Sequence, residues 1–157
     1  MVVEGESMAE MEPAGEIPVS ELIGEETVRV SPQATLTEVA AVLAEANIGA
    51  VVVFDKEKLT GIVSERDIVS AIAEGLDPTK TRARDLANSN LIWCDATATV
   101  SEVANEMMER YVRHVLVEED GVLIGVVSAR DLLGIYAMGD LTIKSLDTQG
   151  HLGASSR

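Results

Sequence analysis

The chain has 157 residues, which allows one compact domain or two small lobes that share a core. Because 46% of the residues are hydrophobic and only 3% are aromatic, that core must be aliphatic. The formal net charge of −15, without any basic run, argues against a protein that binds nucleic acid through its phosphates. Cys94 is the only cysteine, which excludes an intramolecular disulfide and a cysteine-based zinc site and favours a reducing, cytoplasmic compartment.

The N-terminal segment is the most acidic part of the chain. Residues 1–27 contain eight acidic side chains and no lysine or arginine. This segment lacks the basic and apolar regions of a signal peptide, and no stretch of 18 apolar residues occurs anywhere in the chain to span a membrane. We predict that residues 1–16 form a disordered acidic tail. If the chain is a scaffold without a small ligand, the acidic residues 1–27 are a candidate segment for binding an unknown protein partner.

The rest of the chain contains an internal repeat. When the sequence is shifted by 64 residues, residues 28–70 lie over residues 92–134 without a gap, and 14 of the 43 positions are identical. A string of the form G-h-V-S-x-R-D occurs in both copies at the same place. The repeat therefore predicts two copies of one small unit.

Both copies predict the same elements in the order strand, helix, strand, strand, helix. Each first helix opens with a capping box, and each pair of β-branched runs around a polar turn is typical of a hairpin. In the first copy these elements are expected at residues 27–30, from Thr35 onward, at 50–54, at 59–63 and from Ser64 to Gly75. In the second copy they are expected at residues 91–94, from Thr99 onward, at 114–117, at 122–127 and from Ser128 to Gly139.

The predicted fold class is α/β (α+β), with two tandem β-α-β-β-α units. Two such units related by a pseudo-twofold axis can pack their sheets together, with helices on the flanks, and bury a core that neither unit buries alone. We place the first unit at residues 17–78 and the second at residues 79–140. Residues 141–157 are expected to form a C-terminal tail.

The strings GIVSERD at residues 61–67 and GVVSARD at residues 125–131 resemble those of a tandem pair of cystathionine-β-synthase (CBS) domains. The resemblance covers residues 17–140, and the chain is similar to short stand-alone bacterial CBS-pair proteins, including the hypoxic-response protein type. It implies two sheets flanked by helices, with clefts between the units in which many members bind AMP, ADP, ATP or S-adenosylmethionine. It also implies a homodimer formed through the helices.

Two serine–aspartate pairs, Ser64 with Asp67 and Ser128 with Asp131, are the first candidate ligand contacts. The resemblance implies that the aspartate accepts hydrogen bonds from ribose hydroxyls and that the serine contacts phosphate. The free amides and the dipole of a helix N-terminus also favour an anion there. The same spacing is that of a capping box, and this structural role alone can explain both pairs.

Arg113 and His114 stand just before the second strand of the second copy, where the first copy has Gly49 and Ala50. The resemblance implies that basic residues in this region touch phosphate. This difference between the copies predicts that the two clefts are not equivalent. The alternative for Arg113 is an ion pair with Glu109 in the preceding helix.

Arg66 and Arg130 precede the aspartates of the two motifs. A cation in the first turn of a helix opposes the helix dipole, so a repeated arginine there indicates a nearby anion. That anion is either a phosphate or a carboxylate across a dimer. The alternative is a solvated surface position for both arginines.

Six aliphatic side chains are expected to wall an adenine pocket, because the chain has few aromatic rings for stacking. They lie in the hairpin strands: Ala50, Val51, Ile62, Val63, Val126 and Val127. The alternative is that some of them belong to the core.

The sequence contains no recognisable catalytic or metal site. Its two histidines, His114 and His151, lie far apart, and no cluster of metal-ligand spacing or catalytic triad can be assembled. We therefore expect a regulatory module that binds an adenosine compound and does not catalyse a reaction. We predict no metal, and no cofactor apart from this adenosine ligand. The alternative is a dimeric interaction or stress-response scaffold that binds no small ligand.

Overall fold

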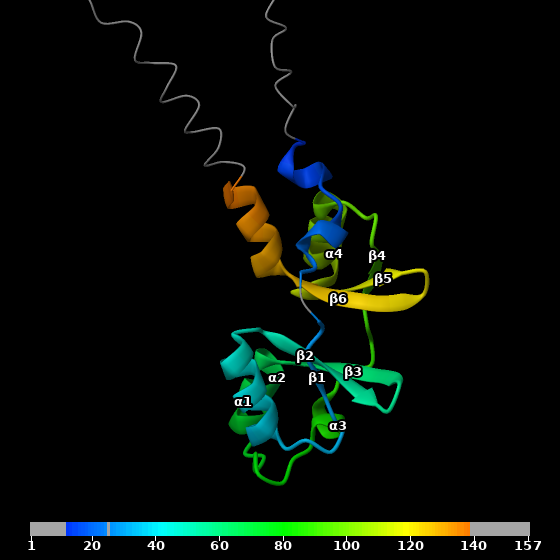
Figure 1. The fold of residues 1–157 in the computed structure, drawn as a ribbon. Helices are drawn as coiled ribbons and strands as arrows, with labels where there is room; N and C mark the ends of the chain where they lie inside the picture. The colour runs from blue at the N-terminus through cyan, green and yellow to red at the C-terminus, as the bar shows by residue number, and fades with distance from the viewer. Residues whose placement is uncertain (1–11, 25, 139–157) are drawn as a thin grey trace, which may run out of the picture.

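The computed structural model describes residues 12–24 and 26–138, and the structural statements below refer to these residues. They form two three-stranded sheets, each with helices packed on one face (Figure 1). The two halves are stacked so that the other faces of the sheets turn toward each other (Figure 1). This arrangement confirms the predicted α/β (α+β) fold with two sheets flanked by helices.

The first sheet has the order β1-β2-β3, with β1 parallel to β2 and β2 antiparallel to β3. Its strands are β1 (Arg29–Val30), β2 (Ala50–Asp55) and β3 (Lys58–Ser64). The helices of this half are α1 (Leu36–Ala46), α2 (Glu65–Ala73) and the short α3 (Ala83–Leu86). Gly75 follows α2 with a φ of +82°, a conformation that favours glycine and agrees with the predicted helix stop.

The second sheet repeats this topology with the order β4-β5-β6. Its strands are β4 (Trp93–Asp95), β5 (His114–Glu119) and β6 (Val122–Ser128). Its helices are α4 (Val100–Arg110) and a helix over residues 129–138. None of the described helices is both long enough and apolar enough to cross a membrane. Gly139, the predicted C-terminal tail and residues 1–11 lie outside the described residues.

The two hairpins match residue for residue. Equivalent residues pair across them, Val51 with Val63 and Val115 with Val127. The register also shifts at the same repeat position, directly after Val53 in the first hairpin and directly after Val117 in the second. The 64-residue repeat in the sequence is therefore a repeat of backbone structure.

Alternation along the strands assigns their side chains to two different environments. One set lies in the two hydrophobic cores under the helices: Val51, Val53, Val63, Val115, Val117 and Val127. Val52 and Leu116, on the opposite faces, are also buried, where the two sheets turn toward each other. Because both faces are buried, these strands are almost continuous β-branched runs in the sequence.

Each core is completed by a segment from outside its own sheet. Val19, in the short 3-10 helix η2 (Val19–Leu22), is fully buried in the core of the second half. Its repeat equivalent, Ala83, is fully buried in the core of the first half. We call the segments that precede the two first strands the crossing segments: residues 19–24 with 26–28, and residues 83–92. The predicted boundary at residue 78 separates the two copies along the sequence, whereas each crossing segment contributes a residue to the core of the other half.

Residues 14–16, which we predicted as part of a disordered tail, form the 3-10 helix η1 (Ala14–Glu16) and contact α4. A Cβ on Gly15 would lie 3.4 Å from Cβ of Ser101 and 3.2 Å from the hydroxyl of Tyr136. At residues 14–16 the prediction of a disordered tail is therefore wrong, because acidic composition does not reveal this close packing.

Candidate ligand-binding cleft

A cleft of about 550 Å³ lies between the two halves. Four stretches of chain line it: the crossing segment before β1, the end of α1 with the loop to β2, the first turn of α2, and the first turn of helix 129–138. Arg113 and His114 complete its wall. The repeated serine motifs of both halves thus meet at one cavity, although 64 residues separate them in the sequence.

Both serine–aspartate pairs form capping boxes, as the structural alternative predicted. The amide of Ser64 donates to Oδ2 of Asp67 at 2.7 Å, and the hydroxyl of Ser64 donates to the same oxygen at 2.9 Å. In the second motif, the amide of Ser128 donates to Oδ2 of Asp131 at 2.8 Å. Within the described hydrogen bonds, Oδ1 of each aspartate accepts none, so each carboxylate keeps an oxygen for another donor.

The two aspartates differ in their access to the cleft. Asp131 is exposed and lines it, together with Ser128 and Arg130. Asp67 is half-buried and is not part of the lining, although Ser64 is. The cleft is therefore more complete at the second motif than at the first.

The crossing segments explain part of this difference. In the first half, Asn88 pairs with Ile62 of β3: their amides donate to each other's carbonyls at 2.9 and 3.1 Å. At the equivalent place in the second half, the described hydrogen bonds include none between Gly24 and Val126. Residues 22–24 and 26–28 therefore stand along the cleft as part of its wall.

Three arginines line the cleft: Arg66, Arg113 and Arg130. The side chains are exposed, and no carboxylate of the described residues lies within ion-pair distance of any of them. The ion pair with Glu109, which was the alternative for Arg113, is thus absent from the described part of the chain. Glu26 and Glu65 also line the cleft, so its charge is mixed.

His114 is the first residue of β5 and lines the cleft. Its Nε2 lies 3.1 Å from where a Cβ on Gly49 would be, so the imidazole packs directly on the backbone of the other half. Burial, followed by the nearby Arg113, lowers the pKa of His114, while Asp131, Glu65 and Asp67 act in the opposite direction. The imidazole is therefore mostly neutral at pH 7.

The aliphatic candidates fall into two groups. Ala50 and Val126 line the cleft, because they lie on the strand faces that turn toward the other half. The cleft does not include Val51, Val63 or Val127, which alternation places in the cores. Ile62 is half-buried outside the lining, next to Asn88.

Sequence reasoning missed the crossing segment and the loop after α1, which includes Asn47 and Ile48. Neither carries a motif. The repeat offered one signal, because residues 22–28 are equivalent to residues 86–92 and both segments directly precede a first strand.

The described residues offer no evident metal centre. No group of three or more histidine, cysteine, aspartate or glutamate side chains among them is placed to hold an ion. The site consists instead of hydroxyl, carboxylate and guanidinium groups around an aliphatic wall, which is suited to a polar organic ligand.

Comparisons with known proteins agree with this geometry. The CBS domain model matches residues 17–74 and 83–137. Hypoxic response protein 1 of Mycobacterium tuberculosis is 37% identical over 105 residues, which cover 66% of this chain and 73% of that protein. A solved structure of Hypoxic Response Protein I with two coordinated zinc ions is 32% identical, with a TM-score of 0.61, and the match covers 75% of this chain and 98% of that one.

A second solved structure, a CBS domain protein from Pyrobaculum aerophilum complexed with AMP, is 35% identical with a TM-score of 0.67. The match covers 78% of this chain and 99% of that chain. The two matches to one domain model span both copies of the repeat, and both solved structures extend over them. The chain belongs to the CBS domain family and contains two CBS domains in tandem.

Proposed function

We propose that this chain is a regulatory module that binds an adenosyl ligand, AMP, ADP, ATP or S-adenosylmethionine, in the cleft between its halves and performs no catalysis. One observation carries the proposal: a cleft of about 550 Å³ contains two helix N-termini and three arginines that have no carboxylate partner among the described residues. This volume is within the range of about 300–1,000 Å³ that is typical of small-molecule sites. The relative from Pyrobaculum aerophilum with bound AMP supports the ligand class.

We assign each group in the cleft to the part of the ligand that suits its chemistry. Oδ1 of Asp131 is available to accept a ribose hydroxyl, and Ala50 and Val126 offer an apolar surface to adenine. At the helix start after Ser128, the amides of Ala129 and Asp131 already donate to the Arg113 carbonyl and the Ser128 hydroxyl. Among the described hydrogen bonds the amide of Arg130 has no acceptor, and this amide, with the Arg130 and Arg113 side chains, favours phosphate. This set of groups favours a nucleotide over S-adenosylmethionine, whose sulfonium carries a positive charge.

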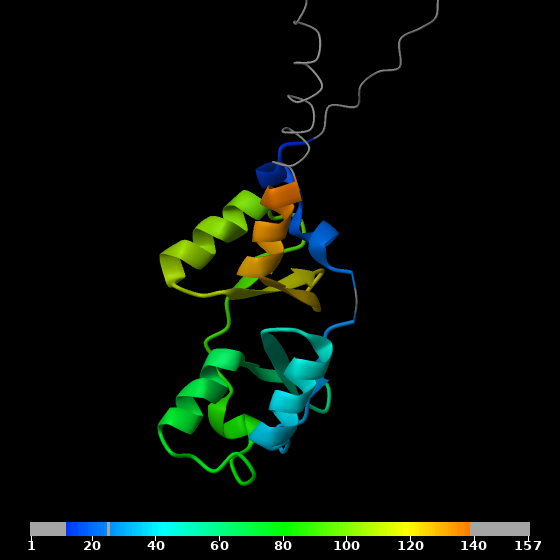
Figure 2. The ribbon, with the colours of Figure 1, turned by 90° about the vertical axis from the view of Figure 1, so that its left-hand side faces the viewer.

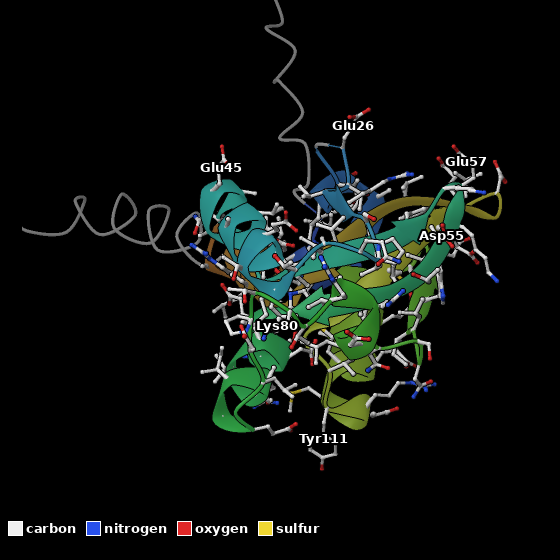
Figure 3. The ribbon with its side chains drawn as sticks, turned by 90° about the horizontal axis from the view of Figure 1, so that it is seen from below. Glu26, Glu45, Asp55, Glu57, Lys80 and Tyr111 are labelled. Carbon is white, nitrogen blue, oxygen red and sulfur yellow. The ribbon has the colours of Figure 1, made fainter. Side chains whose placement is uncertain are left out.

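The Asp131→Asn variant tests the assignment by titration calorimetry with AMP, ATP and S-adenosylmethionine. Loss of a charge-assisted hydrogen bond costs about 1.5–3 kcal/mol, so we expect a loss of affinity of roughly 10- to 100-fold. Asp55→Asn is the matched control, because Asp55 is exposed at the end of β2 and does not line the cleft (Figure 3). Binding that is unchanged in Asp131→Asn would reject the site, and the absence of binding at millimolar ligand would reject the function.

A ligand-free dimeric scaffold is the second candidate, and the exposed apolar side chains favour it. Helices α2 and α4 lie on the same side of the molecule (Figure 2). Val69 and Ile72 on α2 are 67% and 51% exposed, and Met108 on α4 is 76% exposed. Tyr111, which caps α4, is 92% exposed and projects away from the fold (Figure 3). A homodimer formed through these helices would cover this surface.

The dimer is tested by sedimentation equilibrium on the intact chain and on Ile72→Glu. A charge in an apolar interface is costly, so the variant is expected to shift the mass toward the monomer. Leu133→Glu is the matched control, because Leu133 is also exposed but belongs to the helix over residues 129–138 and not to α2 or α4. A thermal-shift screen separates the two functions, because only a ligand that binds the folded state raises the melting temperature.

A further inference from the structure

His114 lines the cleft and has no titratable counterpart in the first copy of the repeat. The equivalent position in the first half is Ala50, and the residue before it is Gly49 in place of Arg113. The missing side chain at Gly49 leaves room for the imidazole, whose Nε2 would lie 3.1 Å from a Cβ there. The imidazole therefore occupies space that the repeat leaves to a small residue.

Charged groups face His114 from several elements. Arg113 precedes it in the chain, Asp131 comes from the helix over residues 129–138, and Glu65 and Asp67 come from α2. Arg66 and Arg130 line the same cleft, as does Glu26 from the crossing segment. The protonation of His114 thus depends on a balance of charges that an anion entering the cleft would change.

We propose that His114 is a selectivity-determining residue, which takes up a proton when a phosphate-bearing ligand binds and thereby favours such ligands over S-adenosylmethionine. This inference rests on the proposed function of the cleft. It names phosphate anions as the ligand class and pH as a condition that regulates their binding.

The physical basis is a change in the charges around the imidazole. In the free protein, burial and the adjacent arginine lower the pKa of His114. A phosphate near Arg113 offsets the arginine's charge and adds a negative charge beside the ring, so the pKa of His114 rises on binding. Because the complex then holds more protons than the separate partners, affinity increases as pH falls, by at most tenfold per pH unit for one proton.

S-adenosylmethionine differs because its sulfonium and ammonium groups outweigh its single carboxylate, and it carries no phosphate. It brings less negative charge to the arginines than a nucleotide phosphate does, and therefore favours the imidazolium ion less. We therefore expect little proton uptake with this ligand. The ratio of ATP affinity to S-adenosylmethionine affinity should rise as the pH is lowered.

Proton uptake is measured by titrating the full chain with ATP at pH 7 in buffers of different ionisation enthalpy. ATP titrates in the same range, so the comparison is with His114→Gln, in which the contribution of ATP itself is unchanged. His151→Gln, which replaces the only other histidine of the sequence, is the control. We expect uptake to fall in His114→Gln and to remain in His151→Gln, and affinity for ATP to rise roughly two- to tenfold from pH 7.5 to 6.5 only when His114 is present.

A second measurement does not depend on a variant. The imidazole proton resonance of His114 is followed against pH in the unmodified chain, alone and with saturating ATP or S-adenosylmethionine. An upward shift of the midpoint with ATP only is expected. ATP binding with an unshifted midpoint and equal uptake in His114→Gln would overturn the inference and leave the proposed function standing, whereas no binding of ATP at all would reject both.

Discussion

The two serine–aspartate motifs have the same sequence spacing, the same capping box and the same place after a hairpin, yet only the second opens fully onto the cleft. Asp67 is half-buried and outside the lining, while Asp131 is exposed within it. Part of the difference arises from the segments that cross each sheet rather than from the motifs. A repeated motif therefore specifies a local backbone, and its neighbours decide whether that backbone forms a site.

The crossing segments differ at a matched pair of glycines. A Cβ on Gly61 would lie 2.8 Å from Cβ of Ala87 and 2.9 Å from the carbonyl oxygen of Asn88. A Cβ on Gly125 would lie 2.7 Å from the terminal carbon of the Ile23 side chain. The first half is thus held by backbone contacts, and the second half by a side chain at the edge of the cleft.

The largest expected effect comes from Val19→Asp. Val19 is fully buried in the core of the second half, so an unpaired carboxylate there should lower the free energy of unfolding by about 3–5 kcal/mol. Gly24→Asp is the control, because Gly24 is exposed and a Cβ on it would meet nothing within 4 Å. Urea unfolding gives the size of the loss, and amide exchange should locate it in the second half. A loss confined to the first half would contradict the exchange of crossing segments.

The second-largest effect is expected for the affinity for AMP, in a comparison of Asp131→Asn with Asp67→Asn. Both variants weaken a capping box and should lose similar stability, about 1 kcal/mol each. Only Asp131 lines the cleft, so only its replacement should reduce affinity for AMP, by roughly 10- to 100-fold. Equal losses of affinity in the two variants would show that both motifs bind ligand and that the comparison above is mistaken.

A smaller difference is expected between Gly61→Ala and Gly125→Ala. The methyl group at position 61 meets a backbone carbonyl, which cannot move without breaking the hydrogen bonds between Ile62 and Asn88. Overpacking of this kind typically costs about 1–3 kcal/mol. The methyl group at position 125 meets the Ile23 side chain, which can change its rotamer, so we expect the smaller loss there. Thermal unfolding of both variants tests the order, and a greater loss at position 125 would reverse it.

Much of the fold could be predicted because its signals are local. The capping boxes of Thr35 and Thr99 and the hairpins depend on residues close in sequence, and the repeat supplied each prediction twice. The crossing segments could not be predicted in this way. The burial of Val19 depends on a core whose other members lie about 80 or more residues later in the chain, and nothing near Val19 marks that distance.

The candidate site was predictable to a similar degree. Ser128, Asp131 and Arg130 belong to a recognisable motif, and the structure brings them together at the cleft. The adjacent aliphatic pairs were the weak point, because neighbours in a strand face opposite ways and only one of each pair can line a cavity. Val127 and Val126 illustrate this: the first lies in the core and the second lines the cleft.

The smallest expected difference is between Thr35→Ala and Thr99→Ala. The hydroxyl of each threonine accepts from the amide three residues on at 3.2 Å, and each threonine amide donates to the glutamate there at 2.7 or 2.8 Å. Removal of either cap should cost about 1 kcal/mol. Because the two boxes are geometrically the same, the two losses should agree within a few tenths of a kcal/mol, which is close to the error of a typical comparison.

Thr35→Ser and Thr99→Ser serve as controls for this pair, since serine keeps the capping hydroxyl and should keep most of the stability. Chemical unfolding of the four variants provides the measurement. Two unequal losses at Thr35 and Thr99 would mean that the surroundings affect even the local caps. Equal losses of stability at the two threonines, together with unequal effects at the aspartates and glycines, would indicate that the crossing segments cause the difference between the halves. The caps would then be a part of each half that the crossing segments do not make different.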